Sequence, residues 1–398
     1  MRRGIVYAGI FLSLLAAAVG AAVQEINSAP WLRGFHFQEA NAEIPLFVER
    51  HGSTTLSLRK SLDYGLHRTA RDYGAGLPTG SVEWSPDGAS LAIAGDNETH
   101  LTFVTPSRNV LHSVPVELTA SHSLLLLSGT SRFVFSPYRP ANRDSTLAMA
   151  DAGSGRTLLE VPGPQPGKDP SFNRAYHLAV SSDQKLAAVS FFWTNNVLIY
   201  RTDDWKVLCR INIDRVPQGL LFFPDNRRVV IAAKPSVFFI VDAIAGTVLN
   251  KIKVPNTGDD PKHFPQSTSA SAMAVSPDQT ELLIGTWVTF LTPSTDDIPM
   301  KDEPHGAVQI LRIKDGASTA SFDWAQPGIY GAAWDSKGHY VAFIDGRDLY
   351  LWQPARPSPS YVKVGFPENV GSLSMTSDGS RIAVATERHV IVFQVEAR

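Results

Sequence analysis

Short apolar runs separated by tight polar turns recur along most of the chain. In SVEWSPDGASLAIAGD, residues 81–96, an apolar run meets a Ser-Pro-Asp-Gly turn and a second apolar run follows. Gly, Pro and Asp favour the turns that join two antiparallel strands. Comparable strings place their turns at seven positions: Asp87, Gly129, Asp183, Asp225, Asp278, Lys337 and Asp378. Helical periodicity is nowhere sustained after residue 24, so the pattern predicts an all-β protein.

The turns mark a repeat. The shortest intervals between them are 41 and 42 residues, within the period of roughly 40 to 45 residues that propeller blades show. Further strand-like runs follow each turn; after Asp225 they are RVVIAA, SVFFIVDA and GTVLNKIKV. Each repeat therefore holds four short strands. Seven such units around an axis predict a seven-bladed β-propeller of four-stranded blades.

The last repeat lacks one strand. GSLSMTS, SRIAVAT and HVIVFQVEA supply three strands, and the sequence ends there. STTLSLRKSL, residues 53–62, is strand-like and has no blade of its own. We expect this N-terminal strand to complete the last blade, because that pairing removes an exposed edge and closes the ring. The predicted organisation is residues 1–22 as a leader, 23–52 as an N-terminal lead segment and 53–398 as the propeller.

The first residues resemble an export signal. Arg2 and Arg3 precede an apolar run that ends in small residues, LLAAAVGAAVQ. This pattern predicts a signal peptide cleaved after Ala22 or nearby. An uncleaved anchor is the alternative, since about 18 apolar residues can span a bilayer. Both place the propeller in the periplasm or outside the cell, and membrane contact is expected only through an uncleaved leader.

Composition removes several functions. The chain has 36 basic and 38 acidic residues and a net charge of −2, which gives no basis for nucleic-acid binding. Its one cysteine, Cys209, cannot form an internal disulfide and reads as a small buried residue in a strand. No nucleophile-elbow, zinc-protease or paired-cysteine string occurs. We therefore expect no metal or organic cofactor.

The repeat resembles a known family. SPDG-type turns, together with the dipeptides Val241-Asp242 and Trp352-Gln353 at strand ends, are similar to bacterial exported members of the WD-repeat-like, or YVTN-type, seven-bladed β-propellers. The resemblance covers about residues 53 to 395. It departs from the family because no Gly-His dipeptide precedes the blades and only Val241-Asp242 approaches the Trp-Asp signature. The resemblance implies the fold and, as its commonest use, protein binding.

The long loops are expected on one face of the ring. Successive strands of a blade alternate in direction, so the short turns between first and second strands lie on one face, and the long loops, which follow the second and fourth strands, lie on the other. Two of these loops, residues 136–145 and 162–177, are basic and aromatic. Arginine and aromatic side chains are favoured interface anchors. With the neighbouring FFWTNN loop they make the predicted binding surface for a protein or peptide partner: Tyr138, Arg139, Arg143, Lys168, Arg174, His177, Trp193 and Asn195. A variable, soluble loop surface is the alternative interpretation.

The other two long loops, residues 255–270 and 291–306, are acidic. They carry two histidines and six carboxylates: His263, His305, Asp259, Asp260, Asp296, Asp297, Asp302 and Glu303. Such groups can hold a hard cation or a transition metal, but the spacing matches no established pattern. Solvated loop charge is the favoured interpretation, and we expect no metal site.

Two functions follow. The favoured one is a non-catalytic exported scaffold that binds a protein or ligand through its loop-rich face. The alternative is a periplasmic propeller enzyme, such as a lactonase-like hydrolase or an oxidoreductase subunit, with its site at the central channel. His177, Arg174 and Tyr330 stand where inner strands begin, which is thin support for the alternative.

Overall fold

The computed structural model describes residues 45–66, 81–85, 87–97, 100–105, 110–115, 124–127, 132–135, 145–163, 175–191, 194–233, 237–254, 264–291, 302–324, 329–356 and 359–397. All of them belong to one compact unit, Glu43–Arg398. Their regular structure consists of strands arranged in seven antiparallel sheets. In these ranges no helix is long and apolar enough to cross a bilayer.

Blades one to four each contain four consecutive strands. Blade one has β3 (Ser81–Trp84), β4 (Leu91–Asn97), β5 (His100–Val104) and β6 (Val110–Pro115). Blade two has β7 (Leu124–Leu127), β8 (Arg132–Phe135), β9 (Ser145–Asp151) and β10 (Thr157–Pro162). Blade three has β11 (Ala175–Val180), β12 (Leu186–Phe191), β13 (Asn196–Arg201) and β14 (Val207–Asn212). Blade four has β15 (Pro217–Phe222), β16 (Arg228–Ala233), β17 (Val237–Asp242) and β18 (Thr247–Lys253).

Blades five to seven include two strands from the N-terminal part. Blade five has β19 (Phe264–Val275), β20 (Glu281–Leu291), β21 (Asp302–Arg312) and β22 (Ser318–Trp324). Blade six has β23 (Ile329–Trp334), β24 (Val341–Asp345), β25 (Asp348–Trp352), β26 (Tyr361–Gly365) and, outermost, β1 (Phe47–His51). Blade seven has β27 (Val370–Met375), β28 (Arg381–Thr386), β29 (His389–Ala397) and β2 (Leu56–Gly65).

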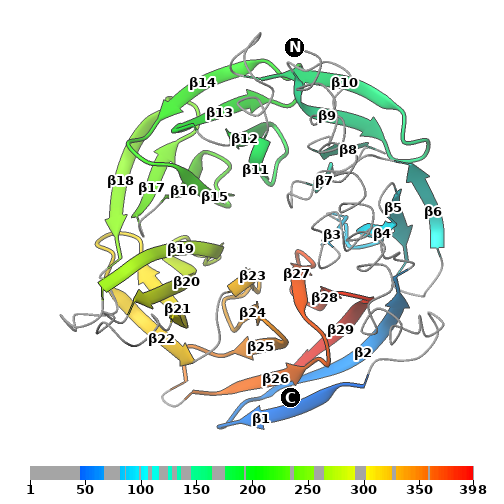
Figure 1. Ribbon diagram of the computed structural model, residues 1–398, viewed down its shortest axis with the longest axis vertical. Helices are drawn as coiled ribbons and strands as arrows, with labels where there is room; N and C mark the ends of the chain where they lie inside the picture. Colours follow the sequence, from blue (N-terminus) through cyan, green and yellow to red (C-terminus); the bar gives the residue numbers. More distant parts are fainter. Residues whose placement is uncertain are drawn as a thin grey trace, which may run out of the picture. The chain divides into compact units, whose positions relative to one another are not determined.

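The blades form a ring. The first strand of each blade is innermost, and these strands contact one another in the order β3, β7, β11, β15, β19, β23, β27 and back to β3 (Figure 1). The prediction of a seven-bladed propeller is confirmed. Its last blade is completed by β2, which pairs antiparallel with β29 from Leu56↔Ala397 to Gly65↔His389. The predicted closure by an N-terminal strand is therefore confirmed as well.

A second N-terminal strand was not anticipated. β1 pairs with β26 from Phe47↔Gly365 to His51↔Tyr361 and gives blade six a fifth strand. The chain then crosses to blade seven through Gly52, whose φ of 65° suits glycine. Gln353 fixes this crossing, because its Oε1 accepts hydrogen bonds from Thr54 Oγ1 at 3.0 Å and Thr55 N at 3.2 Å. The N-terminal segment thus links two neighbouring blades.

The repeated turn has a chemical reason for its sequence. Ser85 Oγ donates to Asp87 Oδ1 at 2.6 Å, and the same carboxylate accepts Ala89 N at 3.0 Å. Ser181 with Asp183, Ser276 with Asp278 and Thr376 with Asp378 repeat the first bond at 2.6 or 2.7 Å. In blade six Asp335 takes the serine's place and accepts Tyr340 N at 2.8 Å. Because Asp335 supplies the carboxylate of this turn, the position usually held by aspartate can be a lysine, Lys337.

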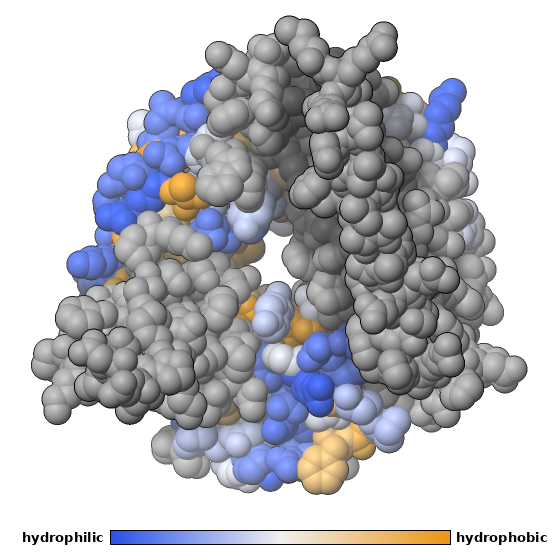
Figure 2. All heavy atoms as spheres, in the orientation of Figure 1, coloured by the Kyte–Doolittle hydropathy of each residue, from blue (hydrophilic) through white to orange (hydrophobic). Residues whose placement is uncertain are grey.

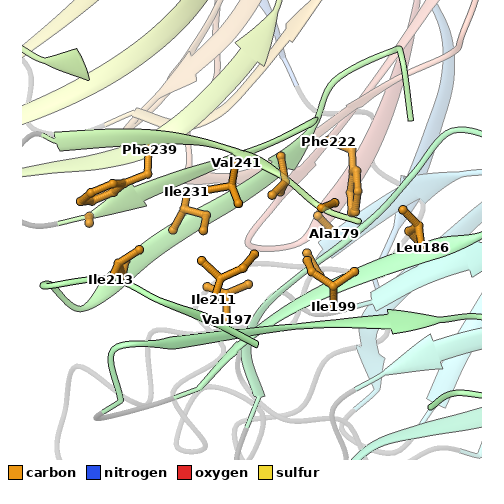
Figure 3. Close-up of a cluster of buried hydrophobic side chains, with 14 of the residues drawn as sticks. Ala179, Leu186, Val197, Ile199, Ile211, Ile213, Phe222, Ile231, Phe239 and Val241 are labelled. Carbon is orange, nitrogen blue, oxygen red and sulfur yellow. The ribbon is translucent and has the colours of Figure 1, made fainter. Parts of the chain in front are cut away.

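The core lies between the blades. One cluster joins Ala179, Val197 and Ile211 of blade three to Ile231 and Phe239 of blade four (Figure 3). Central strands such as β16 and β17 are buried on both faces, which explains why they are apolar at successive positions. Removal of this surface from water is the main favourable contribution to the ring's stability.

Candidate site at the mouth of the central channel

The two faces of the ring differ in chemistry. The short turns between the first and second strands, which contain Ser-x-Asp or Thr-x-Asp in blades one, three, five and seven, share one face, here called the turn face. Each inner strand begins at the opposite face, where Ile329 pairs with Asp345 and Val370 with Thr386. The long insertions also leave and enter the blades there. This second face is called the mouth face. Figure 2 shows an opening at the middle of the ring.

Five inner strands carry a register irregularity at the same place on the mouth face. The pairing skips one residue near the start of β11, β15, β23 and β27, and at Ser271 in the longer β19, which has a further skip at Gln266 outside this group. The five skipped residues grouped here each lie five positions before the first residue of the turn. These residues form what we call the mouth ring: Tyr176, Gln218, Ser271, Tyr330 and Gly371. Bulges re-aim side chains and are common beside functional sites.

The mouth ring is neutral and rich in hydrogen-bonding groups. Tyr330 is 53% exposed although it belongs to an innermost strand. Tyr176 and Gln218 are half-buried. Gln218 Nε2 donates to Pro217 O at 3.1 Å, and the ring of Tyr176 meets that of His177 edge-on at 4.4 Å. The arrangement can contact a peptide or another polar ligand through aromatic faces, hydroxyls and an amide.

Blade five extends beyond its neighbours on the mouth face. β19, β20 and β21 have 12, 11 and 11 residues. Their pairing continues to Phe264↔Leu291 and Leu291↔Asp302, whereas β22 stops pairing at Gly306↔Trp324. Residues 264–270 and 302–306, interpreted from sequence as loop, are therefore strands. The prolines of this extension are at 265 on β19, the edge strand of the sheet, and at 304 on β21, beyond Gly306 where the pairing with β22 has ended. Both positions are edges of the sheet, where proline is tolerated.

Most of the predicted binding surface lies outside the described residues. This applies to Tyr138, Arg139, Arg143, Lys168, Arg174 and Trp193. His177 lies on β11 next to the mouth ring, and its backbone N–H donates to Ser190 Oγ at 3.1 Å. Asn195 is exposed between β12 and β13, and its carbonyl accepts Ile213 N at 3.0 Å. The basic surface therefore stays a prediction.

The acidic loops are also mostly outside the described residues. Asp259, Asp260, His263, Asp296 and Asp297 belong to this group. The other three are on β21, where Asp302, Glu303 and His305 pair with Leu291, Phe290 and Val288. Among the described residues, no three histidine, cysteine or acidic side chains are grouped as metal ligands.

Two carboxyl groups in the described blades are strongly perturbed. Asp345 is fully buried where β24 reaches the mouth face, and burial, reinforced by the nearby Asp348 charge, raises its pKa to about 7. Glu83 lies on the inner strand β3. Removal from water raises its pKa to about 7, against a smaller opposing effect of the hydrogen bond from Ser374. Perturbed carboxyls of this kind are candidates for functional groups.

Sequence reasoning named Tyr330 and included Tyr176 only as part of the aromatic loop 162–177, and it missed Gln218 and Glu83. A usable signal existed, because mouth-ring residues share a fixed offset from the turn. Reading that offset blade by blade would have collected Gln218 with the two tyrosines. Choosing that offset in advance, however, requires knowing where the bulge lies, and the pattern of apolar residues does not show this.

Comparison with known proteins supports the fold alone. No protein-family model matches the chain, and no curated protein matches its sequence. Among solved structures it is similar to hydrazine synthase of Kuenenia stuttgartiensis, with 16% identity, a TM-score of 0.62 and coverage of 80% of this chain and 96% of that one. It is also similar to the WD40 domain of Neurospora crassa Pan2, with 12% identity, a TM-score of 0.61 and coverage of 85% and 95%. At these identities the similarity defines a propeller and leaves the function to the site.

Proposed function

We propose that the chain is an exported, non-catalytic scaffold that binds a protein or peptide partner at its mouth face. The mouth ring supports this proposal, because five blades have a bulge at one register, and Tyr176, Gln218 and Tyr330 occupy three of these positions near the start of inner strands. The propeller fold fits a binding scaffold, since it holds variable loops on a rigid ring. The basic residues predicted from sequence would extend the surface outward over blades two and three.

The proposal of export rests on the leader pattern. Arg2, Arg3 and the apolar run after them support secretion, and the small residues near Ala22 support cleavage. An exported propeller with a single cysteine relies on its core and ring closure for stability. This agrees with a rigid platform whose partner contacts lie in loops.

Site-specific crosslinking tests the binding face. A photo-crosslinking amino acid at Tyr330 is expected to capture a discrete partner in cells that express the full chain. The same group at Leu249, which is 56% exposed on the outer strand β18, is the control and should not capture it. With the purified partner, combined Tyr330→Ala and Gln218→Ala should weaken binding at least tenfold, because both contacts are lost.

Charge reversal tests the outer part of the surface. Combined Arg139→Glu, Arg143→Glu and Arg174→Glu should also weaken the same complex while the thermal unfolding midpoint stays unchanged. Leu249→Ala should bind as the unaltered chain does. Equal affinity for the mouth-ring variant, the charge-reversed variant and the rim control would refute a partner site on the mouth face.

A further inference from the structure

Glu83 has an unusual position among the inner strands. Within their described bounds, these seven strands contain no lysine, arginine or aspartate, and Glu83 is their only glutamate. It stands two residues before the first turn residue. The equivalent residues in five other blades are small or apolar: Ala179, Leu221, Ala274, Ala333 and Ser374. One carboxyl group therefore interrupts a neutral layer of the ring.

The carboxyl group of Glu83 lies on the channel side of β3. The outer edge of β3 pairs with β4, whereas the backbone N–H groups of Val82 and Trp84 donate to Ser372 Oγ and Ser374 Oγ, each at 3.2 Å. Those hydroxyls therefore lie along the inner edge of β3. Because Ser374 Oγ also contacts Glu83 Oε2 at 3.4 Å, the carboxyl group must reach that same inner edge.

The surroundings of this carboxyl group are incomplete for an anion. Its one hydrogen bond within the described residues is long, and in this part of the chain no cation contributes to the shift of its pKa. Glu83 is half-buried, and partial removal of a carboxylate from water without a positive partner is costly, so with a pKa of about 7 about half of the group is protonated near pH 7. A positive group placed beside it would restore its charge and gain a short ionic hydrogen bond.

We propose that Glu83, with the hydroxyls of Ser372 and Ser374, forms a channel site for one protonated amine or guanidinium group. The cation enters from the mouth face, where the aromatic rings of Tyr176 and Tyr330 attract positive charge. Glu83 is three residues deeper than the mouth ring, or about 10 Å along a strand. This inference deepens the proposed function, because the cation is either a side chain of the partner or a small free amine.

Calorimetry with simple cations tests the site in the full mature chain. The probes are n-butylammonium and n-butylguanidinium, with n-butanol as the neutral analogue. We expect saturable one-site binding of both cations and none of n-butanol. Titration at pH 7 in two buffers of different ionisation enthalpy should show proton release, because the bound cation drives ionisation of Glu83.

Two isosteric variants give the site its specificity test. Glu83→Gln should weaken cation binding at least tenfold and abolish proton release. Glu396→Gln removes a carboxylate that is 46% exposed and pairs with Arg59 on the outer side of blade seven, and it should behave as the unaltered chain does. Absence of saturable binding, or equal binding by Glu83→Gln, would overturn the proposal.

The effect of Glu83→Gln on the affinity for the purified partner shows where the cation comes from. If Glu83→Gln loses both the probe and the purified partner, the cation is a side chain of that partner. If it loses only the probe, the natural ligand is a free amine. Capture of a partner from Tyr330 does not depend on Glu83, so failure of the channel site and failure of the mouth-face function are separately visible.

Discussion

Replacement of Leu62 by alanine is expected to lower the free energy of unfolding by about 3 kcal/mol, the usual cost of truncating a buried leucine. Leu62 is 1% exposed on β2, and it packs with Val82 and Leu91 of blade one and with Ala383 and Val390 of blade seven. The cavity would therefore open at the point where the ring closes. Urea unfolding followed by tryptophan fluorescence measures the change.

Leu249→Ala is the matched control. Leu249 also lies on the outer strand of a blade, but it is 56% exposed and its loss should change stability by no more than about 0.5 kcal/mol. The comparison separates the burial of β2 from any general effect of shortening a leucine. Equal, small effects of the two substitutions would mean that β2 does not pack into the ring as described.

Stability is expected to fall as pH rises from about 4 to about 7 because of Asp345. The unfolded chain loses this proton near the ordinary pKa of about 4, whereas the native chain holds it to about 7. Within that window the native state binds more protons, so rising pH favours unfolding, by about 4 kcal/mol when complete. Asp345→Asn removes this pH-dependent loss, so relative to the unaltered chain it should gain up to about 4 kcal/mol between pH 4 and pH 8.

Asp378 supplies a control of opposite sign. The hydrogen bond from Thr376, followed by those from Ser380, holds its pKa at about 2. Its contribution to stability is present above pH 4 and lost as pH falls toward 2, so Asp378→Asn should destabilise the protein at pH 8. Denaturant unfolding at pH 4, 6 and 8 measures both variants. A stability difference between Asp345→Asn and the unaltered chain that does not grow with pH would contradict the buried, protonated carboxyl.

The sequence was informative where local chemistry repeats. A serine or threonine two residues before an aspartate is a recognisable turn, and the structure shows the bond that makes it so at Ser85 and Thr376. The missing strand of the last repeat then predicted closure by the N-terminal segment. Both inferences depend on counting strands, which the alternation of apolar runs and turns allows.

The fifth strand of blade six could not be counted in this way. Phe47 and Val48 on β1 are 66% and 50% exposed, so β1 is held mainly by backbone pairing and its sequence shows little apolar pattern. The extension of blade five was hidden differently: Pro265 and Pro304 suggest loops, but Pro265 lies on the edge strand β19 and Pro304 on the part of β21 that β22 does not pair with. Backbone pairing decides both features, and hydropathy does not report it.

The candidate site was predictable only in part. The mouth face followed from antiparallel parity, and Tyr330 was visible as the start of a strand. Glu83 was not predictable, because one acidic residue in a short strand such as SVEW is ordinary. It stands out only when the strands are aligned around the ring and the other inner strands show no acidic residue at the same position. Its importance is a property of the assembled ring.

Ring closure by β2 is the claim on which the faces, the mouth ring and the channel depend, and a designed disulfide tests it most directly. Arg59 and Gln394 are register partners across β2 and β29 whose side chains touch. With Cys209→Ser as background, Arg59→Cys plus Gln394→Cys should oxidise to an intramolecular disulfide and raise the unfolding temperature. Arg59→Cys plus Arg388→Cys, six residues out of register, should stay reduced. A disulfide in the second pair, or in neither, would contradict the closure described here.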